Sequence, residues 1–200
     1  MKVIGLTGQS GAGKGTVASI LAKHDIPHID CDKVYHSLLV SDTDCTKALA
    51  KTFGPEILAE NGSVDRKKLG AIVFTGEGHE KRLDTLNKIT HKYVLDECRK
   101  KLRVYADEGK KAAVVDAPTL FESGFDKECD ILLAVITPEE IRLNRILKRD
   151  GISRDKAKER FAAQLSEEYF RKHADHIIEN SSDTDALASE VQKFIREKLS

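Results

Sequence analysis

The chain has 200 residues, 40% of them apolar, which is long and apolar enough for one folded domain with a buried core. Its 33 basic residues balance 33 acidic ones, so net charge gives no reason to expect a nucleic acid or an anionic membrane as a partner. No apolar run approaches the roughly 20 residues of a membrane span, and the apolar start is too short for a signal peptide, so we expect a cytoplasmic protein. Four widely spaced cysteines without a C-x-x-C pair argue against a zinc site or a disulfide framework.

The first elements are a strand, a glycine-rich loop and a helix. Residues 2–7 form a β-rich apolar run, and the segment 8–16, GQSGAGKGT, follows it at once. Val17, Ile20 and Leu21 then recur at helical spacing. This order of elements is the context that a phosphate-binding loop requires.

The rest of the chain alternates between strands and helices. Short strands are expected at 28–30, 112–116, 130–136 and 176–180, and the pattern between 33 and 110 is helical. The alternation predicts an α/β fold with a five-stranded parallel sheet flanked by helices. We expect a single domain over 1–200, with a core of 1–32, 111–137 and 174–200, a helical acceptor-binding insertion at about 33–110, and an arginine-rich lid at about 138–173.

The glycine-rich loop has the chemistry to hold ATP. Backbone N–H groups of such a loop can surround phosphates without side chains, and the following helix adds its N-terminal dipole. Lys14 is the fixed cation, placed to reach the β- and γ-phosphates. The expected nucleotide-binding residues are Gly11, Ala12, Gly13, Lys14, Gly15 and Thr16.

The loop departs from the strict pattern directly after its lysine. Gly15 stands where a serine or threonine usually binds Mg²⁺, and the first hydroxyl comes one residue later, at Thr16. We therefore expect Mg²⁺ to be held more through water and phosphates, with Thr16 as its candidate protein contact. The same G-K-G-T ending is typical of adenylate-kinase-like enzymes, so the departure favours a small-molecule kinase.

Carboxylates follow two of the predicted strands. Asp32 lies just after the second strand and could accept a proton from an attacking substrate hydroxyl, although Asp30 and Asp32 could equally cap the next helix. Asp116 ends the third strand and could orient metal-bound water or contact the substrate. The carboxyl ends of parallel strands face the ligand crevice, which is why both positions are candidates.

An arginine stripe is predicted on a helix that begins near Pro138. Arg142, Arg145 and Arg149 fall at i, i+3 and i+7, so they share one face and repel one another. That repulsion favours an anion in front of the stripe over a plain solvated face. Arg154 and Arg160 follow, and together these residues predict a mobile lid over the transferred phosphoryl group.

Along nearly its whole length the chain resembles the dephospho-coenzyme A kinase family. The opening IGLTG, the IDCD segment at 29–32, and FG at 53–54 followed by GSVDR at 62–66 are similar to family motifs. So are DAPTLFESG at 116–124, with Thr119 where leucine is usual, and the later arginine, Ala174-Asp175 and Asn180 positions. The order of these pieces carries the resemblance more than any one of them.

The resemblance implies a P-loop nucleotide kinase fold and transfer of the ATP γ-phosphoryl group to the ribose 3′-hydroxyl of dephospho-coenzyme A. We expect Mg²⁺ as cofactor and favour a monomer. Asp32 would be the general base, and Lys14 with Arg142 or Arg145 would stabilise the phosphoryl charge. Substrate contacts are expected from Asp32, Asp116, Arg66 and His91. His91 is followed by Lys92 where the family usually has proline, so we expect the helix to continue there and favour a structural histidine.

Two other functions are compatible with a phosphate loop. A kinase for another small acceptor, such as a nucleoside monophosphate, would share the loop and the lid and would differ in the insertion. A GTP-dependent switch is disfavoured, because the N-K-x-D motif that usually reads guanine is absent: Asn87-Lys88-Ile89-Thr90 lacks the acid.

Overall fold

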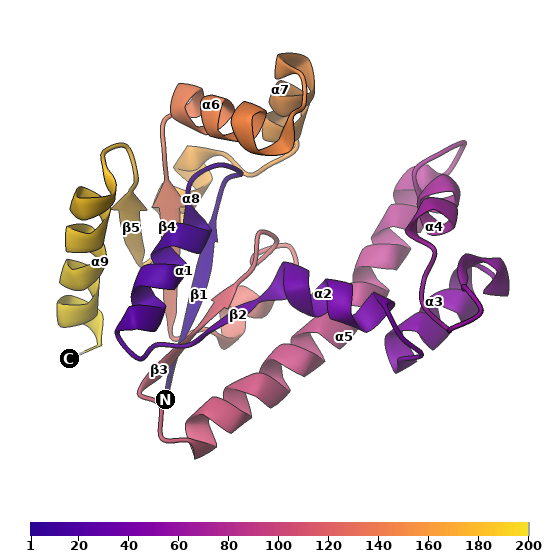
Figure 1. Ribbon diagram of the computed structural model, residues 1–200, viewed down its shortest axis with the longest axis horizontal. Coiled ribbons are helices and arrows are strands. Elements are labelled where there is room, and N and C mark those ends of the chain that lie inside the picture. The colour runs from indigo at the N-terminus through magenta and orange to yellow at the C-terminus, as the bar shows by residue number, and fades with distance from the viewer. Residues whose placement is uncertain (200) are drawn as a thin grey trace. The chain divides into compact units, whose positions relative to one another are not determined.

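The computed structural model describes residues 1–199 (Figure 1). The strands are β1 (Lys2–Gly8), β2 (His28–Asp30), β3 (Ala112–Asp116), β4 (Ile131–Ile136) and β5 (His176–Glu179). The helices are α1 (Lys14–Lys23), α2 (Cys31–Leu39), α3 (Asp44–Phe53), α4 (Arg66–Val73), α5 (His79–Asp107), α6 (Glu139–Asp150), α7 (Arg154–Ala162), α8 (Glu167–His173) and α9 (Thr184–Lys198), with 3-10 turns at Pro55–Ile57 and Phe125–Glu128. All five predicted strands are confirmed, to within one residue at each end.

The strands form one sheet in the order β2-β3-β1-β4-β5. β1 pairs in parallel with both β3 and β4, and β4 pairs in parallel with β5. The central strands read as continuous apolar runs because helices bury both faces of the sheet. The predicted α/β fold with a parallel sheet is therefore confirmed.

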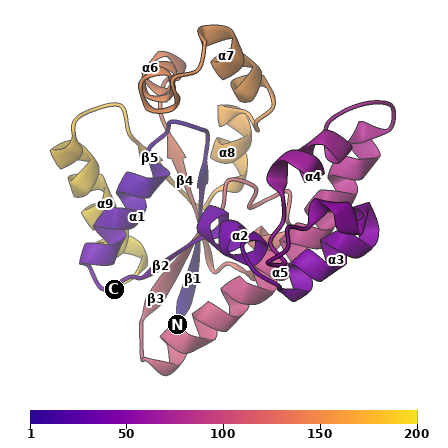
Figure 2. The same cartoon turned by 45° about the vertical axis from the view of Figure 1, so that its right-hand side comes forward.

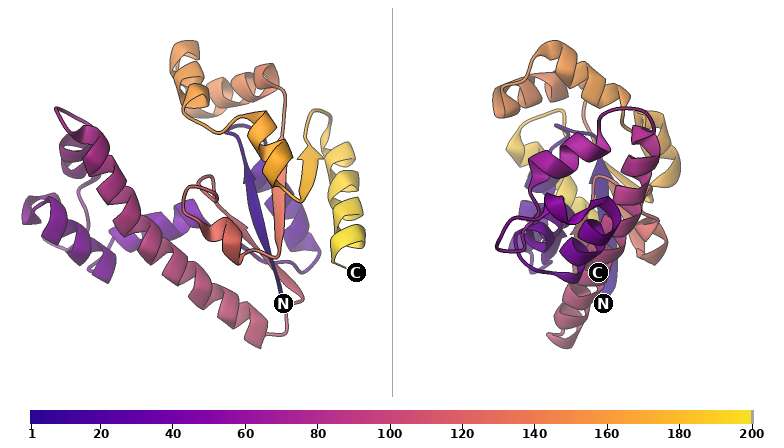
Figure 3. Two further views of the ribbon diagram at one scale, coloured as in Figure 1. Left: turned by 180° about the vertical axis from the view of Figure 1, so that it is seen from behind. Right: turned by 90° about the vertical axis from the view of Figure 1, so that its right-hand side faces the viewer.

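The chain divides into two compact units, one made of residues 1–29 with the chain from Leu102 onward, the other of residues 30–101. In the first unit, α1 and α9 pack together on one face of the sheet, and α8 lies against β4 on the opposite face (Figures 1 and 3). Ile4, Leu21 and Phe194 are among the fully buried side chains of this core.

The second unit is helical. Helices α2, α3 and α4 gather around the first half of α5 (Figure 2). Their apolar side chains share one cluster, which includes Leu39, Leu49, Leu69 and Leu86. α5 runs unbroken through His91 and Lys92, as expected once proline is absent from that position. Within residues 1–199, no helix is long and apolar enough to cross a membrane.

Candidate active site

The glycine loop lies between the end of β1 and the start of α1. Gly11 and Gly13 adopt positive φ angles of 80° and 98°, which L side chains rarely tolerate. Gly13 is the N-cap of α1, and no side chain within residues 1–199 caps that helix or places an acid in its first turn. The positive end of the α1 dipole therefore stays available to an anion. Lys14 is the first residue of α1, and its Nζ donates to the Gly8 carbonyl oxygen across the loop at 3.0 Å.

Two segments of the predicted lid contact this loop from outside. The Gln164 side chain, just after α7, exchanges two hydrogen bonds with Ser10: Ser10 N–H donates to Oε1 at 3.1 Å, and Nε2 donates to Ser10 Oγ at 2.9 Å. Arg145 on α6 donates from Nη1 to the Gly11 carbonyl oxygen at 3.2 Å. The guanidinium of Arg145 thus meets the loop backbone, and its direct role on the phosphoryl group stays a prediction.

Arg142 is the buried cation of this site, with only 4% of its surface exposed. Its Nε donates to the Thr137 carbonyl oxygen at 3.0 Å, and its guanidinium carbon lies 4.2 Å from the centre of the Phe161 ring. Nη1 is buried and has no hydrogen-bond partner among residues 1–199. Burial lowers the pKa of Arg142, which nevertheless stays charged. A buried guanidinium with an unsatisfied donor fits a site that is completed by an anion.

The remaining lid arginines pair with acids. Arg149 and Arg160 both bind the carboxylate of Asp150, and Arg154 binds Glu140 at 3.1 Å. The two arginines hold the pKa of Asp150 well below its usual range. The expectation that Arg149 faces an anion as part of the arginine stripe is therefore wrong, because Asp150 neutralises it. The lid role of Arg154 and Arg160 stays a prediction. Of the five, Arg145 bonds the loop backbone, and the backbone of Arg142 lies beside Gly11.

A cavity of about 230 Å³ opens beside the loop. It is lined by the N-cap Gly13, by Thr16 of α1 and by Arg145 of α6. The start of α9 and the segment before it contribute Asn180, Ser182, Asp183, Thr184 and Leu187. Thr16 therefore faces this cavity, and its expected contact with Mg²⁺ stays a prediction. The position beside the loop suits the part of a nucleotide that extends away from its phosphates.

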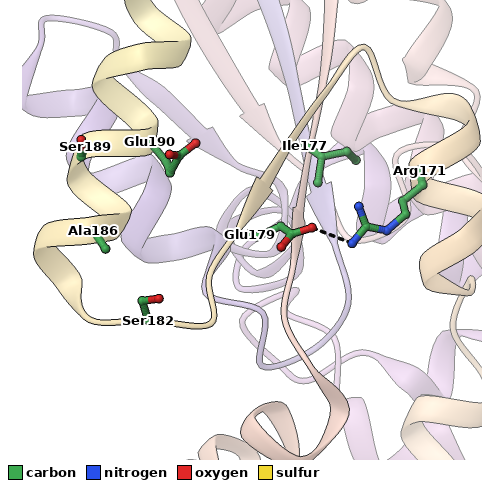
Figure 4. A pocket seen from close by; sticks show the side chains of 7 residues that line it. All are labelled: Arg171, Ile177, Glu179, Ser182, Ala186, Ser189 and Glu190. Carbon is green, nitrogen blue, oxygen red and sulfur yellow. Dashed lines mark hydrogen bonds and ion pairs between the residues drawn. The ribbon is translucent and has the colours of Figure 1, made fainter.

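A larger cavity, of about 590 Å³, lies between α8, β5 and α9 (Figure 4). Its arginine, Arg171, binds Glu179 at 2.7 Å and also Glu167. Because both carboxylates neutralise this guanidinium, the cavity offers a phosphate little attraction. The smaller cavity beside the loop is the better candidate for nucleotide binding, despite its size.

Asp116 is half-buried at the carboxyl end of β3, where it is in register with Leu6 of the neighbouring β1. This is the edge of the sheet at which β1 enters the glycine loop. No group of three or more histidine, cysteine or acidic side chains within residues 1–199 could hold a metal by itself. Mg²⁺ bound by one carboxylate together with substrate phosphates needs no such group, so the residues present fit that mode of binding.

In the helical unit, the two aspartates after β2 have different roles. Asp30 is the N-cap of α2 and accepts a hydrogen bond from Lys33 N–H at 3.0 Å. Asp32 lies in the first turn and is exposed. The capping alternative therefore applies to Asp30, and the Asp32 carboxylate remains accessible to a substrate.

The other predicted acceptor residues also lie in this unit. Arg66 is the first residue of α4, and its Nη1 lies 3.4 Å from His36 Nδ1. His36 comes four residues after Asp32 on α2, so both side chains are on the same face of that helix. His91 is half-buried on α5. The substrate roles of Arg66 and His91 stay predictions.

Sequence reasoning assigned no role to three residues near these sites, although Asn180 was among the positions that carry the resemblance. Thr137 directly follows β4, Asn180 directly follows β5, and both bind the loop backbone. Their places at the carboxyl ends of parallel strands were a usable signal. His36 carried a weaker signal, its helical spacing from Asp32.

Comparisons with known proteins agree on one family. The dephospho-CoA kinase family model matches residues 2–186. A dephospho-CoA kinase from Fusobacterium nucleatum is 39% identical over 192 residues, 96% of each chain. One from Bdellovibrio bacteriovorus is 36% identical over 196 residues, 98% of this chain and 96% of the relative.

Solved structures extend the agreement to the fold. The dephospho-CoA kinase from Campylobacter jejuni superposes with a TM-score of 0.72 at 29% identity and covers 100% of this chain and 98% of that one. The shikimate kinase from Acinetobacter baumannii, with a TM-score of 0.55 and 18% identity, shares the fold alone. On these matches, which span nearly the whole chain, the protein belongs to the dephospho-CoA kinase family.

Proposed function

We propose that this protein is a dephospho-CoA kinase, which transfers the γ-phosphoryl group of ATP to the ribose 3′-hydroxyl of dephospho-CoA. The observation that carries the proposal is a phosphate loop with Lys14 and an uncapped helix N-terminus, in a chain whose relatives are dephospho-CoA kinases over nearly their full length. The products are ADP and CoA. We expect a cytoplasmic monomer with small-molecule substrates.

Asp32 is the proposed general base. Its carboxylate would take the proton of the 3′-hydroxyl while that oxygen forms a bond to the γ-phosphorus and the bond to the β–γ bridging oxygen breaks. Exposure of this carboxylate, with Asp30 acting as the cap, supports the assignment. Arg66, His36 and His91 are proposed to bind the acceptor in the same helical unit.

The nucleotide site is proposed on the other unit. The loop from Gly11 to Thr16 would hold the β- and γ-phosphates, Lys14 and Arg142 would balance their charge, and the cavity beside the loop would take the base. Mg²⁺ carried by ATP would neutralise phosphate charge, with Asp116 and Thr16 as its candidate protein contacts. Arg145, which bonds the loop backbone, is proposed to assist catalysis by holding the loop in place.

The identity of the acceptor substrate distinguishes this proposal from the nearest alternative, a kinase for another small molecule. ADP release is measured with dephospho-CoA, with AMP and with shikimate, each against a control without acceptor. The proposal expects turnover that depends on dephospho-CoA and formation of CoA. Turnover with AMP and none with dephospho-CoA would make this chain a nucleoside monophosphate kinase.

The base is tested separately by Asp32→Asn, which keeps the shape and removes the basic oxygen. Loss of a general base typically lowers kcat about 10²- to 10⁴-fold. ATP affinity, measured by calorimetry, should stay unchanged. A near wild-type kcat would rule Asp32 out as the base and leave the phosphotransferase activity itself in place.

A further inference from the structure

The carbonyl oxygens of the phosphate loop are bonded by side chains that lie behind it. Asn180 Nδ2 donates to the Ala12 carbonyl oxygen at 2.7 Å, and Thr137 Oγ1 lies 3.0 Å from the same oxygen. Arg145 Nη1 lies 3.2 Å from the Gly11 oxygen and 3.4 Å from that of Ala12. We call Thr137, Arg145 and Asn180 the carbonyl clamp.

The clamp is also bonded within itself, and Thr137, Asn180 and the Ala12 that they hold are buried. Thr137 Oγ1 lies 3.0 Å from the Asn180 carbonyl oxygen, so its one proton is shared between two acceptors, and Arg145 Nη2 donates to that Asn180 oxygen at 3.3 Å. Thr137 is 1% exposed, Asn180 6% and Ala12 fully buried. Because Ala12 is buried, removing one donor leaves its carbonyl oxygen less well satisfied.

The clamp fixes the direction of a neighbouring N–H group. The peptide between Ala12 and Gly13 is planar and trans, so its carbonyl oxygen and its N–H point to opposite sides. With the Ala12 oxygen held by the clamp, the Gly13 N–H points to the opposite side, away from the clamp. On the clamp side of Gly13 there is no room for a side chain, because a Cβ on Gly13 would lie 2.2 Å from Asn180 Nδ2.

The sheet delivers two members of the clamp to the same place. Thr137 and Asn180 directly follow β4 and β5, which pair in parallel, so both side chains emerge at the edge where the loop lies. Arg145 joins them from α6 and ties the lid to the loop. None of these contacts needs a side chain in front of the loop, where the phosphates would bind.

We propose that Thr137, Asn180 and Arg145 are positioning residues, which hold the Ala12–Gly13 peptide with its N–H turned toward the nucleotide phosphates. The proposal rests on the proposed function in that the loop binds ATP. Arg145 then acts through the loop backbone. Loosening the clamp weakens phosphate binding, and it affects the transfer step less because the reacting groups stay intact.

Thr137→Val tests the clamp most directly, since valine keeps the shape of threonine and removes the hydroxyl. Thr137 is buried behind the loop, so any change in nucleotide binding is transmitted by the backbone. Thr137→Ser keeps the hydroxyl and should restore binding. Thr90→Val is the matched control, because Thr90 is also buried and its hydroxyl bonds only the carbonyls of its own helix, at 2.9 Å for Leu86.

Calorimetry then gives the Kd for ATP and for inorganic tripolyphosphate, which has no base or ribose, and steady-state kinetics gives kcat and the KM for ATP. For Thr137→Val we expect about a tenfold rise in both Kd values and in KM, the size of one lost buried hydrogen bond, with kcat within about threefold of wild type. Thr137→Ser and Thr90→Val should bind both ligands like wild type. Unchanged Kd values in a folded Thr137→Val protein would overturn the proposal.

Asn180→Ala provides a second, independent test of the clamp that can be used if Thr137→Val does not fold. Asn180 also lines the cavity beside the loop, so ATP binding alone would not separate the two roles. Weaker binding of tripolyphosphate as well as ATP supports the clamp, whereas a loss confined to ATP overturns it in favour of direct contact with the base. Wild-type protein that binds neither ligand would instead refute the proposed function.

Discussion

Replacing Arg142 with methionine separates a functional role of this side chain from a structural one. Methionine is similar in length and uncharged, so Arg142→Met keeps much of the packing and removes the guanidinium. Arg142 is buried, stacked on Phe161 and bonded through Nε to the Thr137 oxygen, while its Nη1 has no partner within residues 1–199. These contacts allow the effect on stability to be bounded.

In the ligand-free protein, the stabilising interactions that Arg142→Met removes and those that it adds are similar in free energy. Losing the charged hydrogen bond costs about 1.5–3 kcal/mol, and losing the cation–π contact with Phe161 costs about 0.5–2 kcal/mol. Removing the unsatisfied Nη1 returns about 1–3 kcal/mol, and a thioether on the ring returns about 0.3–1.5 kcal/mol. These ranges allow a loss of at most about 4 kcal/mol in the free energy of unfolding, or a fall of at most about 15 °C in Tm for a chain of this size.

Activity should respond far more strongly than stability. If Arg142 binds the phosphates, its loss removes charge stabilisation from the transferred group, which typically lowers kcat about 10²- to 10³-fold. The assay is ADP release with dephospho-CoA, paired with thermal unfolding without nucleotide. Arg149→Met is the matched control on the same helix, since Arg149 is bound to Asp150. A Tm lower by more than about 15 °C with kcat/KM within threefold of wild type would refute the reasoning.

Two further predictions concern the loop and the lid. Gly11→Ala should weaken ATP binding more than about tenfold, because the new Cβ would lie 2.8 Å from the Arg142 carbonyl oxygen at a φ of +80°; calorimetry that gives a wild-type Kd would contradict this. Asp150→Asn should lower stability at pH 7, because Arg149 and Arg160 depress the pKa of this carboxyl in the folded state. A carboxyl whose pKa is depressed in the folded state contributes stability above its unfolded pKa near 3.8, and this stability is lost as the pH falls through the folded pKa. Urea unfolding should therefore show the free energies of unfolding of wild type and Asp150→Asn converging in acid. An equal difference between the two proteins at pH 7 and pH 3 would contradict this prediction.

The fold could be predicted because its signals are local. Each strand is a short apolar run between turn residues, and the alternation of strands with helices restricts the sheet to a parallel arrangement. The glycine loop was recognisable for the same reason, since its function resides in backbone groups at fixed spacing. α5 also followed from a local feature, the absence of proline after His91.

The partners of individual side chains were harder to predict, because they depend on contacts distant in sequence. Arg145 meets the carbonyl oxygen of Gly11, 134 positions earlier, and a carbonyl oxygen has no sequence signature. Spacing placed Arg142, Arg145 and Arg149 on one face of α6, yet it could not show that Asp150 would bind the last of them. Similarly, either Asp30 or Asp32 could cap α2 until the backbone was known.

The loop departs from the strict pattern at Gly15, and the fold does not require glycine at this position for steric reasons. A Cβ at this position would meet nothing within 4 Å, and Gly15 is not among the glycines with positive φ. Serine there should therefore fold without strain and return a hydroxyl to the place from which the strict motif binds Mg²⁺. We expect Gly15→Ser to keep kcat at saturating Mg²⁺ and to lower several-fold the Mg²⁺ concentration that gives half the maximal rate. Gly15→Ala adds the same Cβ without the hydroxyl, so identical Mg²⁺ dependence of the two variants would mean that the metal in this loop does not use a ligand at position 15.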